Sequence, residues 1–279
     1  MKRFLTAALA LLILASCAPK STPVTLKLIS YNIRQSGLAE KDGPDAWPFR
    51  KEATLNMIEQ EAPSIIGFQE LLPDQQAYIR EAFPQYGFVG VGRDDGKEEG
   101  ECMGIMYLAD AFELLDSGTF WLSETPEEVS MGWDAACRRT VTWVHLKESS
   151  AGKEFFYLNT HLDHIGELAR QESIKLIVDR IGQLVPKGMP VILGGDLNSG
   201  TENPIFEPLF KAGMQLAREV SPETDNSGTF NGFGSAPSSI ILDHLFIKGV
   251  KPISYQVLKA DYGAPFISDH YPVAFTFEL

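Results

Sequence analysis

The stretch PVILGGDLNS, residues 190–199, runs from an apolar segment into two glycines and then into an acid and an amide. A short run such as Val-Ile-Leu is typical of a strand buried on both faces. Asp196 and Asn198 are two positions apart, so an extended backbone directs both side chains to one side. We expect Gly194 and Gly195 to let another group approach the backbone closely. The stretch therefore predicts a buried strand whose end carries part of a polar site.

Five other short apolar segments end or begin at a polar side chain in the same way. They are rich in Ile, Val, Phe and Tyr and are bounded by turn residues, which predicts strands. Most are apolar on both faces, which indicates sheets that are covered on both sides. These segments are 25–32 ending in Asn32, 64–70 ending in Glu70, 155–161 ending in His161, 239–246 containing Asp243, and 266–277 opening on Asp269 and His270.

Amphipathic segments lie between the predicted strands. Residues 48–63 start at a proline, repeat apolar residues at helical spacing and stop at a second proline, which predicts a helix. Residues 74–83 and 166–185 are amphipathic in the same way. The segments 100–108 and 138–146 are expected to be antiparallel strands that interrupt the alternation of strand and helix. We expect two mixed sheets packed face to face with helices outside, an α+β architecture.

The polar residues at the strand ends share a chemistry. If the ends converge, they form a cluster of carboxylate and amide oxygens with two imidazoles. Such oxygens suit hard cations, and we therefore expect Mg²⁺ or Mn²⁺ as the cofactor. A bound metal of this kind polarises a phosphoryl oxygen, and a neighbouring His–Asp pair can activate water.

The N-terminus predicts export. Residues 1–16 have a basic start, an apolar core and small residues before Cys17, which indicates a signal peptide too short to span a membrane. LASC, residues 14–17, resembles a bacterial lipobox, and this resemblance implies cleavage before Cys17 and its lipidation. Residues 17–24 would then form a lipidated tether. An ordinary signal with an incidental cysteine is the alternative. We expect a membrane-anchored lipoprotein, periplasmic or at the cell surface.

Composition limits the class of protein. Residues 25–279 contain no linker, repeat or low-complexity run, which favours a single domain, and we expect a monomer. The formal net charge of −13 argues against a broad electrostatic grip on nucleic acid, which needs clustered cations. Cys102 and Cys137 are expected to be free thiols, with a disulfide between them as the alternative.

The ordered set of strand-end residues resembles the endonuclease/exonuclease/phosphatase superfamily, whose fold is DNase I-like. The strings SYNIR, GFQE, NTHLDH and GGDLNS are most similar to the branch of nocturnin and carbon-catabolite-repressor-type deadenylases. The resemblance covers residues 25–279 and implies a four-layer α/β-β/α sandwich. It also implies a divalent-metal phosphoesterase that hydrolyses a phosphodiester or phosphomonoester by in-line attack of water.

The resemblance further implies a role for each residue. Glu70 would be the principal metal ligand, with Asn32 and Asp269 beside it. Asp243 would orient His270. Asp196 would activate the water and His270 would protonate the leaving group or bind phosphate, although these two roles are interchangeable. Asn198 would hold a phosphate oxygen or the water, and His161 would donate to the phosphorane. Apart from the resemblance, we expect Gly194 and Gly195 to make room for the phosphate.

Several other residues are candidates with a structural alternative. We expect Glu101 to steady His161, or to be a surface acid at a strand end. Asp163 is expected to support His161 from behind. Arg50, Arg138 and Arg139 suit phosphate, because a guanidinium pairs well with it, although each could instead form an ordinary salt bridge. The loop 225–239, with Phe230 and Phe233, either borders the site or pins itself to the body.

Two other classes of protein are alternatives. NTHLDH differs from the zinc motif of metallo-β-lactamases only by Asn159 in place of the first histidine, which removes a zinc ligand. A non-catalytic binding lipoprotein is the other alternative. Two kinds of substrate are compatible with the sequence. The branch resemblance favours 3′–5′ exonuclease action on RNA. Export and the acidic charge favour a nucleotide, an inositol phosphate or a phospholipid head group.

Overall fold

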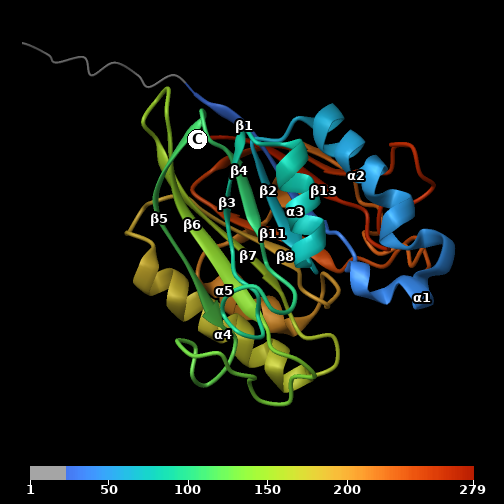
Figure 1. The fold of residues 1–279 in the computed structure, drawn as a ribbon. Coiled ribbons are helices and arrows are strands. Elements are labelled where there is room, and N and C mark those ends of the chain that lie inside the picture. Colours follow the sequence, from blue (N-terminus) through green and yellow to red (C-terminus); the bar gives the residue numbers. More distant parts are fainter. Residues whose placement is uncertain (1–22) are drawn as a thin grey trace, which may run out of the picture.

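The computed structural model describes residues 23–279, which form two β-sheets stacked face to face with helices on the outside (Figure 1). The expected four-layer sandwich is therefore confirmed. The predicted signal peptide and Cys17 lie outside the described residues. Within residues 23–279, no helix combines the length and the apolar character that crossing a membrane requires.

Consecutive strands mostly belong to the same sheet. One sheet has seven strands, in the order β10 (Glu223–Thr224), β12 (Lys251–Val257), β13 (Val273–Glu278), β1 (Thr25–Asn32), β2 (Ile65–Gln69), β4 (Ile105–Leu108) and β3 (Tyr86–Val89). The other has six, in the order β5 (Phe112–Trp121), β6 (Thr140–Glu148), β7 (Glu154–His161), β8 (Val191–Asp196), β11 (Asp243–Lys248) and β9 (Gln215–Leu216). The neighbours β1–β2 and β7–β8 are parallel, and the strands beside them are mainly antiparallel.

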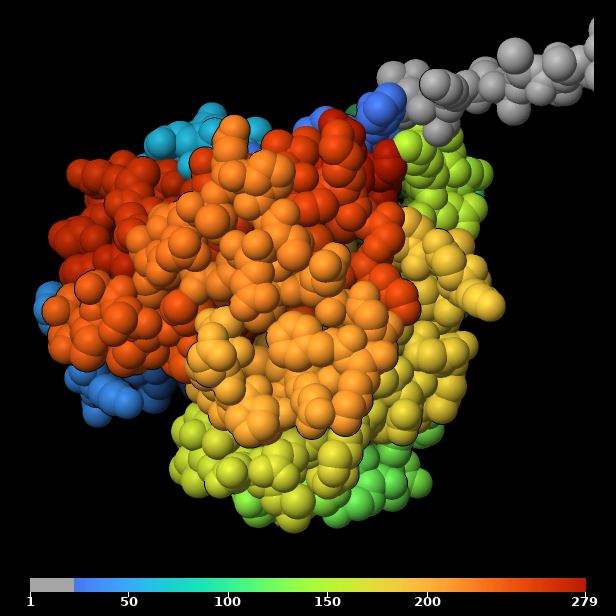
Figure 2. Space-filling view, turned by 180° about the vertical axis from the view of Figure 1, so that it is seen from behind, coloured from blue at the N-terminus to red at the C-terminus, as the bar shows by residue number. Residues whose placement is uncertain are grey.

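Helices cover the outer face of each sheet. The helices α2 (Trp47–Glu61) and α3 (Pro73–Ala82) pack on the seven-stranded sheet, and α4 (Glu167–Leu184) and α5 (Glu207–Lys211) pack on the six-stranded one (Figure 1). The shorter helices are α1 (Ala39–Asp42) and α6 (Ala217–Val220). Figure 2 shows that the last third of the chain, in orange and red, covers most of the opposite face. The two sheets are thus buried on both sides, as their apolar strands require.

The helix boundaries follow the prolines. Pro48 lies in the first turn of α2, where its missing N–H costs nothing. The helix ends at Ala62, which has a left-handed φ of 43°, and Pro63 follows it. Pro73 opens α3 in the same way. The three predicted helices therefore agree with the structure to within two residues at each end.

The core between the sheets is aromatic. Phe155 of β7 packs against Phe277 of β13, with ring centroids 6.0 Å apart, and Phe275 stacks on Phe277. Tyr157 is fully buried between the sheets. A Cβ atom added at Gly67 would overlap the hydroxyl of Tyr157, and one added at Gly194 would crowd Leu245 and the same tyrosine. Glycine at these two positions therefore makes room for the tyrosine.

The requirement for glycine at position 195 comes from a different neighbour, Thr160. The φ of Gly195 is 143°, and a Cβ atom there would collide with the carbonyl oxygen of Thr160 on the adjacent strand β7. The expectation that Gly194 and Gly195 clear space for a phosphate group is therefore wrong. Both glycines serve the packing of β8 against its neighbours, because no side chain fits there.

Two predicted strands differ from the structure. In 266–277 the strand β13 begins only at Val273, so Asp269 and His270 lie on the loop before it. In 239–246 the strand β11 begins at Asp243. The hydroxyl of Ser268 donates to the carbonyl oxygen of Asn32 at 2.6 Å, and this contact holds the loop against the end of β1. Cys102 and Cys137 are free thiols, as expected.

Replacing Gly195 with alanine should destabilise the protein by more than about 2 kcal/mol, because the new Cβ forces β7 and β8 apart. Urea unfolding followed by circular dichroism measures this change. Gly182→Ala is the matched control, since Gly182 lies in α4 with no atom within 4 Å of a new Cβ. That variant should gain about 0.5–1 kcal/mol. Equal stabilities of the two variants would contradict the packing role of Gly195.

Candidate active site

The strand register places three candidate residues side by side. In the six-stranded sheet, His161 of β7 lies opposite Asp196 of β8, and Asp196 lies opposite Asp243 of β11. The parallel pairing of β7 and β8 brings both of their ends to one edge, and β11 starts at that edge because it is antiparallel. The sequence pattern at the strand ends therefore becomes a row of side chains across three strands.

Asn32 connects this row to the other sheet. Its Nδ2 atom donates to Oε1 of Glu70 at 3.1 Å and to Oδ2 of Asp196 at 3.0 Å. Glu70 follows β2 directly, and both Glu70 and Asn198 have left-handed backbones, with φ of 60° and 47°. Such conformations are uncommon for residues with a side chain and gather at functional sites. The two sheets thus contribute to one site.

His270 joins the row from the loop before β13. Its Nδ1 atom donates to Oδ2 of Asp243 at 2.8 Å, and its Nε2 atom lies 3.6 Å from Oδ2 of Asp196. Burial by itself would lower the pKa of His270, but Asp243 and then Asp196 raise it to about 10. The imidazole is therefore a cation at neutral pH.

The carboxylates of the site crowd one another. Burial, and after it the charge of Asp243, raises the pKa of Asp196 to about 7 despite the nearby His270. Burial and Glu70 also raise the pKa of Asp269. Acidic groups that are this close and this deeply buried favour a bound cation.

His161 is neutral. Burial, followed by the positive charges of Arg139 and Arg93, lowers the pKa of His161 well below its usual value. Its Nε2 atom lies 3.0 Å from the side-chain amide of Asn198 and 3.4 Å from Oδ2 of Asp196. The Nδ1 atom on the other side of the ring has no hydrogen-bond partner among the described residues.

The family model for the "Endonuclease/Exonuclease/phosphatase family" matches residues 29–270, a range that includes every residue of this row. The chain belongs to this family. It is similar over 92% of its length to a crystal structure of an endonuclease/exonuclease/phosphatase from Bacteroides vulgatus, with 34% identity, a TM-score of 0.86 and 99% of that chain covered. Members of the family are phosphoesterases and nucleases, and the chain is an enzyme that hydrolyses phosphate esters.

Three further similar proteins are informative. A mannosyl-6-phosphatase from Bacteroides thetaiotaomicron is 34% identical over 90% of this chain and 99% of its own, with a TM-score of 0.85. The catalytic domain of human nocturnin covers 91% of this chain and 94% of its own with a TM-score of 0.69, but its 17% identity shows a shared fold alone. The uncharacterised mimivirus protein L388 is 26% identical over 91% of this chain and its own full length.

One cavity of about 820 Å³ receives most of the predicted residues. Asn32 and Asp243 do not line the cavity but contact residues that do. Arg138, Asp163 and Arg50 do not line it either. The predicted residues that line the cavity are Glu70, Glu101, Arg139, His161, Asp196, Asn198, Asp269 and His270.

The arginines divide into two kinds. Arg50 is 1% exposed and donates to the carbonyl oxygens of Ile33, Arg34, Asp45 and Ile267, so its expected phosphate contact is wrong. It ties the end of β1 to the loop that carries Asp269. Arg138 pairs with Asp94 at the surface, which also contradicts a phosphate role. Arg139 alone of the three lines the cavity.

Glu101 and Asp163 hold other partners than expected. Glu101 is buried, so it is no surface acid, and it lies 4.0 Å from His161, too far for a hydrogen bond. It accepts instead from Arg93 at 2.5 Å and from Gln35. Asp163 accepts from Arg139 and from backbone N–H groups, and therefore supports Arg139. Glu101 therefore lies against the ring of His161 without a hydrogen bond to it, whereas the side-chain partners of Asp163 are Arg139 and Cys137.

Sequence reasoning missed Arg34. Its side chain lines the cavity, pairs with Asp42 at 2.7 Å and lies 3.4 Å from Asp269. The residue is part of the string SYNIR, two positions after Asn32, so its position beside a strand end was the signal. The loop residues Phe230 and Phe233 also line the cavity, and the ring of Phe230 packs edge-on to His270 at 5.0 Å.

A divalent metal fits this donor set. The carboxylates of Glu70 and Asp269 both line the cavity, and the side-chain amide of Asn32 contacts Glu70. Oxygen donors of these types suit hard cations. Asp196, Asp243 and His270 also place ligand atoms within 4.8 Å of one another. Since Nδ1 of His270 is already bonded to Asp243, we regard this trio as a hydrogen-bonded chain next to the metal position.

The zinc alternative does not fit the structure. Asn159 is fully buried and its amide bonds to Gln69 and to the carbonyl oxygens of Phe68 and Gly104. It therefore belongs to the packing between the sheets. The family assignment likewise excludes the metallo-β-lactamase reading and argues against a non-catalytic protein.

Asp163→Asn should lower the free energy of unfolding at pH 7 by about 2–3 kcal/mol. Burial acts to raise the pKa of Asp163, but the N–H groups of Gly166, Ile165 and Ala136, with Arg139, lower it well below its usual range. Its contribution is therefore complete above the unfolded pKa of about 4 and is lost as the pH falls further. Urea unfolding at several pH values should show the difference between variant and wild type shrinking below about pH 4. A difference independent of pH would contradict this account.

Proposed function

We propose that the protein is a phosphoesterase dependent on Mg²⁺ or Mn²⁺ that hydrolyses a small phosphorylated substrate, in the first place a sugar phosphomonoester. The observation that carries this proposal is the meeting of Glu70, Asn32, Asp196 and His270 across both sheets in one cavity. When bound, the metal would neutralise the phosphoryl oxygens and make the phosphorus more electrophilic.

The residues of the chain supply the proton transfers. Glu70 and Asn32, with Asp269, would hold the metal. Asp196 has a pKa raised to about 7, which suits a base that removes a proton from the attacking water. His270, cationic through its contact with Asp243, would hold a phosphoryl oxygen or protonate the leaving oxygen. Asn198 and His161 lie beside Asp196 and would contact the charge that builds up on phosphorus.

The choice of a sugar phosphate has two supports. The mannosyl-6-phosphatase is 34% identical over nearly the whole of both chains. The net charge of −13 disfavours long polyanions such as RNA, whose binding relies on many phosphate contacts with Lys and Arg. Small phosphate esters need only the local cations of the cavity.

The proposal is tested by phosphate release from mannose 6-phosphate, inositol phosphates, nucleotides and RNA, with Mg²⁺, with Mn²⁺ and with EDTA. We expect release from the sugar phosphate with either metal and none with EDTA. His270→Ala should lower kcat by about 100-fold or more. Glu70→Gln should raise the metal concentration for half-maximal activity by at least about 10-fold. Release from RNA alone would refute the substrate class.

A matched control keeps the result specific. His145 lies on β6 of the same sheet as His161, but pairs with Glu154 outside the cavity. His145→Gln should therefore keep kcat within about twofold, because His145 does not line the cavity. If it loses as much activity as His270→Ala, general instability rather than the site explains the losses.

We also propose that the protein is an exported monomer anchored by lipid at Cys17. The supports are the N-terminal sequence and its lipobox-like LASC. In a bacterial host, full-length protein should sediment with membranes, and Cys17→Ser should move it to the soluble fraction, because the anchor is lost. A Cys17→Ser protein that remains in the membrane pellet would contradict lipid anchoring, and light scattering of the soluble variant reports the oligomeric state.

A further inference from the structure

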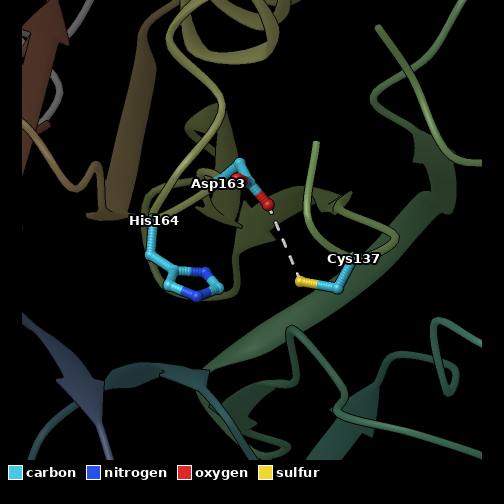
Figure 3. A group of neighbouring side chains, drawn as sticks. All are labelled: Cys137, Asp163 and His164. Carbon is cyan, nitrogen blue, oxygen red and sulfur yellow. Dashed lines mark hydrogen bonds between the residues drawn. The ribbon is translucent and has the colours of Figure 1, made fainter. Parts of the chain in front are cut away.

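A second cluster of side chains lies at the edge of the active-site cavity. Cys137, Asp163 and His164 place their ligand atoms within 4.8 Å of one another, and Figure 3 shows them gathered around the carboxylate of Asp163. Cys137 and His164 line the cavity. At first sight the trio resembles a metal site.

The hydrogen bonds argue against a metal. Both oxygens of Asp163 already accept hydrogen bonds, and Nδ1 of His164 accepts from Nη2 of Arg139 at 3.0 Å. A positive guanidinium therefore occupies the position that a cation would need. The donors to Asp163 are the backbone N–H groups of Ala136, Ile165 and Gly166, the thiol of Cys137 (Figure 3) and Nε of Arg139.

What the trio holds is Arg139. This residue is 4% exposed and lines the cavity, and its Nη1 atom has no acceptor among the described residues. Because Asp163 is also stabilised by three backbone N–H groups, the charge of Arg139 is only partly compensated by it. A buried guanidinium with a free N–H group is costly unless an anion or water meets it.

Arg93 adds a second guanidinium to this part of the cavity. It lines the cavity, and its Nη1 atom binds Glu101 while its Nε atom has no acceptor in the described part of the chain. The pair of arginines therefore keeps a surplus of N–H donors.

We propose that Arg139, Arg93 and His164 form an anion subsite that binds a second acidic group of the substrate, separate from the phosphate that is hydrolysed. This inference rests on the proposed function, because it assumes that the hydrolysed phosphate lies at Asp196. The substrate class is then a sugar phosphate that carries a second phosphate or a carboxylate.

The ring of His161 separates the two positions. Asn198 and Asp196 contact its Nε2 side, whereas Glu101, the partner of Arg93, faces its Nδ1 side at 4.0 Å. A phosphate that reacts beside Asp196 and His270 thus leaves the guanidinium side of the cavity free. Planar guanidinium groups recognise phosphate and carboxylate through paired N–H donors.

The test compares substrates with one and two acidic groups. The probes are fructose 6-phosphate against fructose 1,6-bisphosphate, and glucose 6-phosphate against 6-phosphogluconate, so that the two pairs distinguish a second phosphate from a carboxylate. For the wild type we expect kcat/KM to be at least about 10-fold higher for the doubly acidic member of one pair, mainly because its KM is lower. Arg139→Gln and Arg93→Gln should each reduce this ratio to within about threefold of unity.

Arg138→Gln is the matched control, because Arg138 adjoins Arg139 in sequence but pairs with Asp94 outside the cavity. It should retain the wild-type ratio. A wild-type ratio near one in both pairs, or a ratio that survives both Arg139→Gln and Arg93→Gln, would overturn the subsite. Thermal unfolding of each variant shows whether it is folded, and Arg139→Lys, which keeps the charge but not the paired donors, should recover only part of the ratio.

A binding experiment tests this inference independently of the proposed function. Calorimetric titration of the metal-free protein with the same four sugars needs no turnover. Tighter binding of a doubly acidic sugar that is lost in Arg139→Gln supports the subsite even if none of the four is hydrolysed, an outcome that would count against the proposed function alone. Equal affinities within both pairs would overturn the subsite even if all four are hydrolysed.

Discussion

The site depends on the two hydrogen bonds that the side-chain amide of Asn32 donates. Asn32 is the last residue of the central strand of one sheet, and its donors reach Glu70 on that sheet and Asp196 on the other. An amide can satisfy two carboxylates at once without adding charge, and it thereby fixes the spacing of two acids that repel each other. The aromatic core between the sheets sets this distance, because Tyr157 and the phenylalanines keep the two layers apart.

Around this contact the site is organised as two halves with opposite charge. Acids collect where β1, β2 and β8 end, while Arg93 and Arg139 lie beyond His161. The acids raise the pKa of His270, whereas burial and then the two arginines lower the pKa of His161, so that one histidine is cationic and the other is neutral within the same cavity. The surroundings of each histidine, rather than its residue type, set its protonation state and therefore its role. Other active sites in which the pKa values of paired titratable groups are pushed apart work in the same way.

The sequence predicted strand ends better than it predicted loops. The residues on β1, β7 and β8 were found because alternation and burial fix which side chains share an edge. Asp269 and His270 were assigned to a strand, since the apolar run around them hid the loop that Ser268 fastens to β1. The role of Gly195 needed the position of Thr160, which is 35 residues away in the chain and has no local signal. Arg50 was misjudged for a related reason: four carbonyl oxygens from three separate segments of the chain surround it.

The direction of β1 has a consequence for where substrate comes from. The strand starts at Thr25, where the chain enters the described fold, and its eight residues end at Asn32 in the site, about 23 Å further on (Figure 1). With an anchor at Cys17, the catalytic mouth would be held at the far end of the sandwich from the bilayer. Such an arrangement would separate the point of attachment from the catalytic mouth by the length of β1, which favours substrates that arrive from the surrounding fluid.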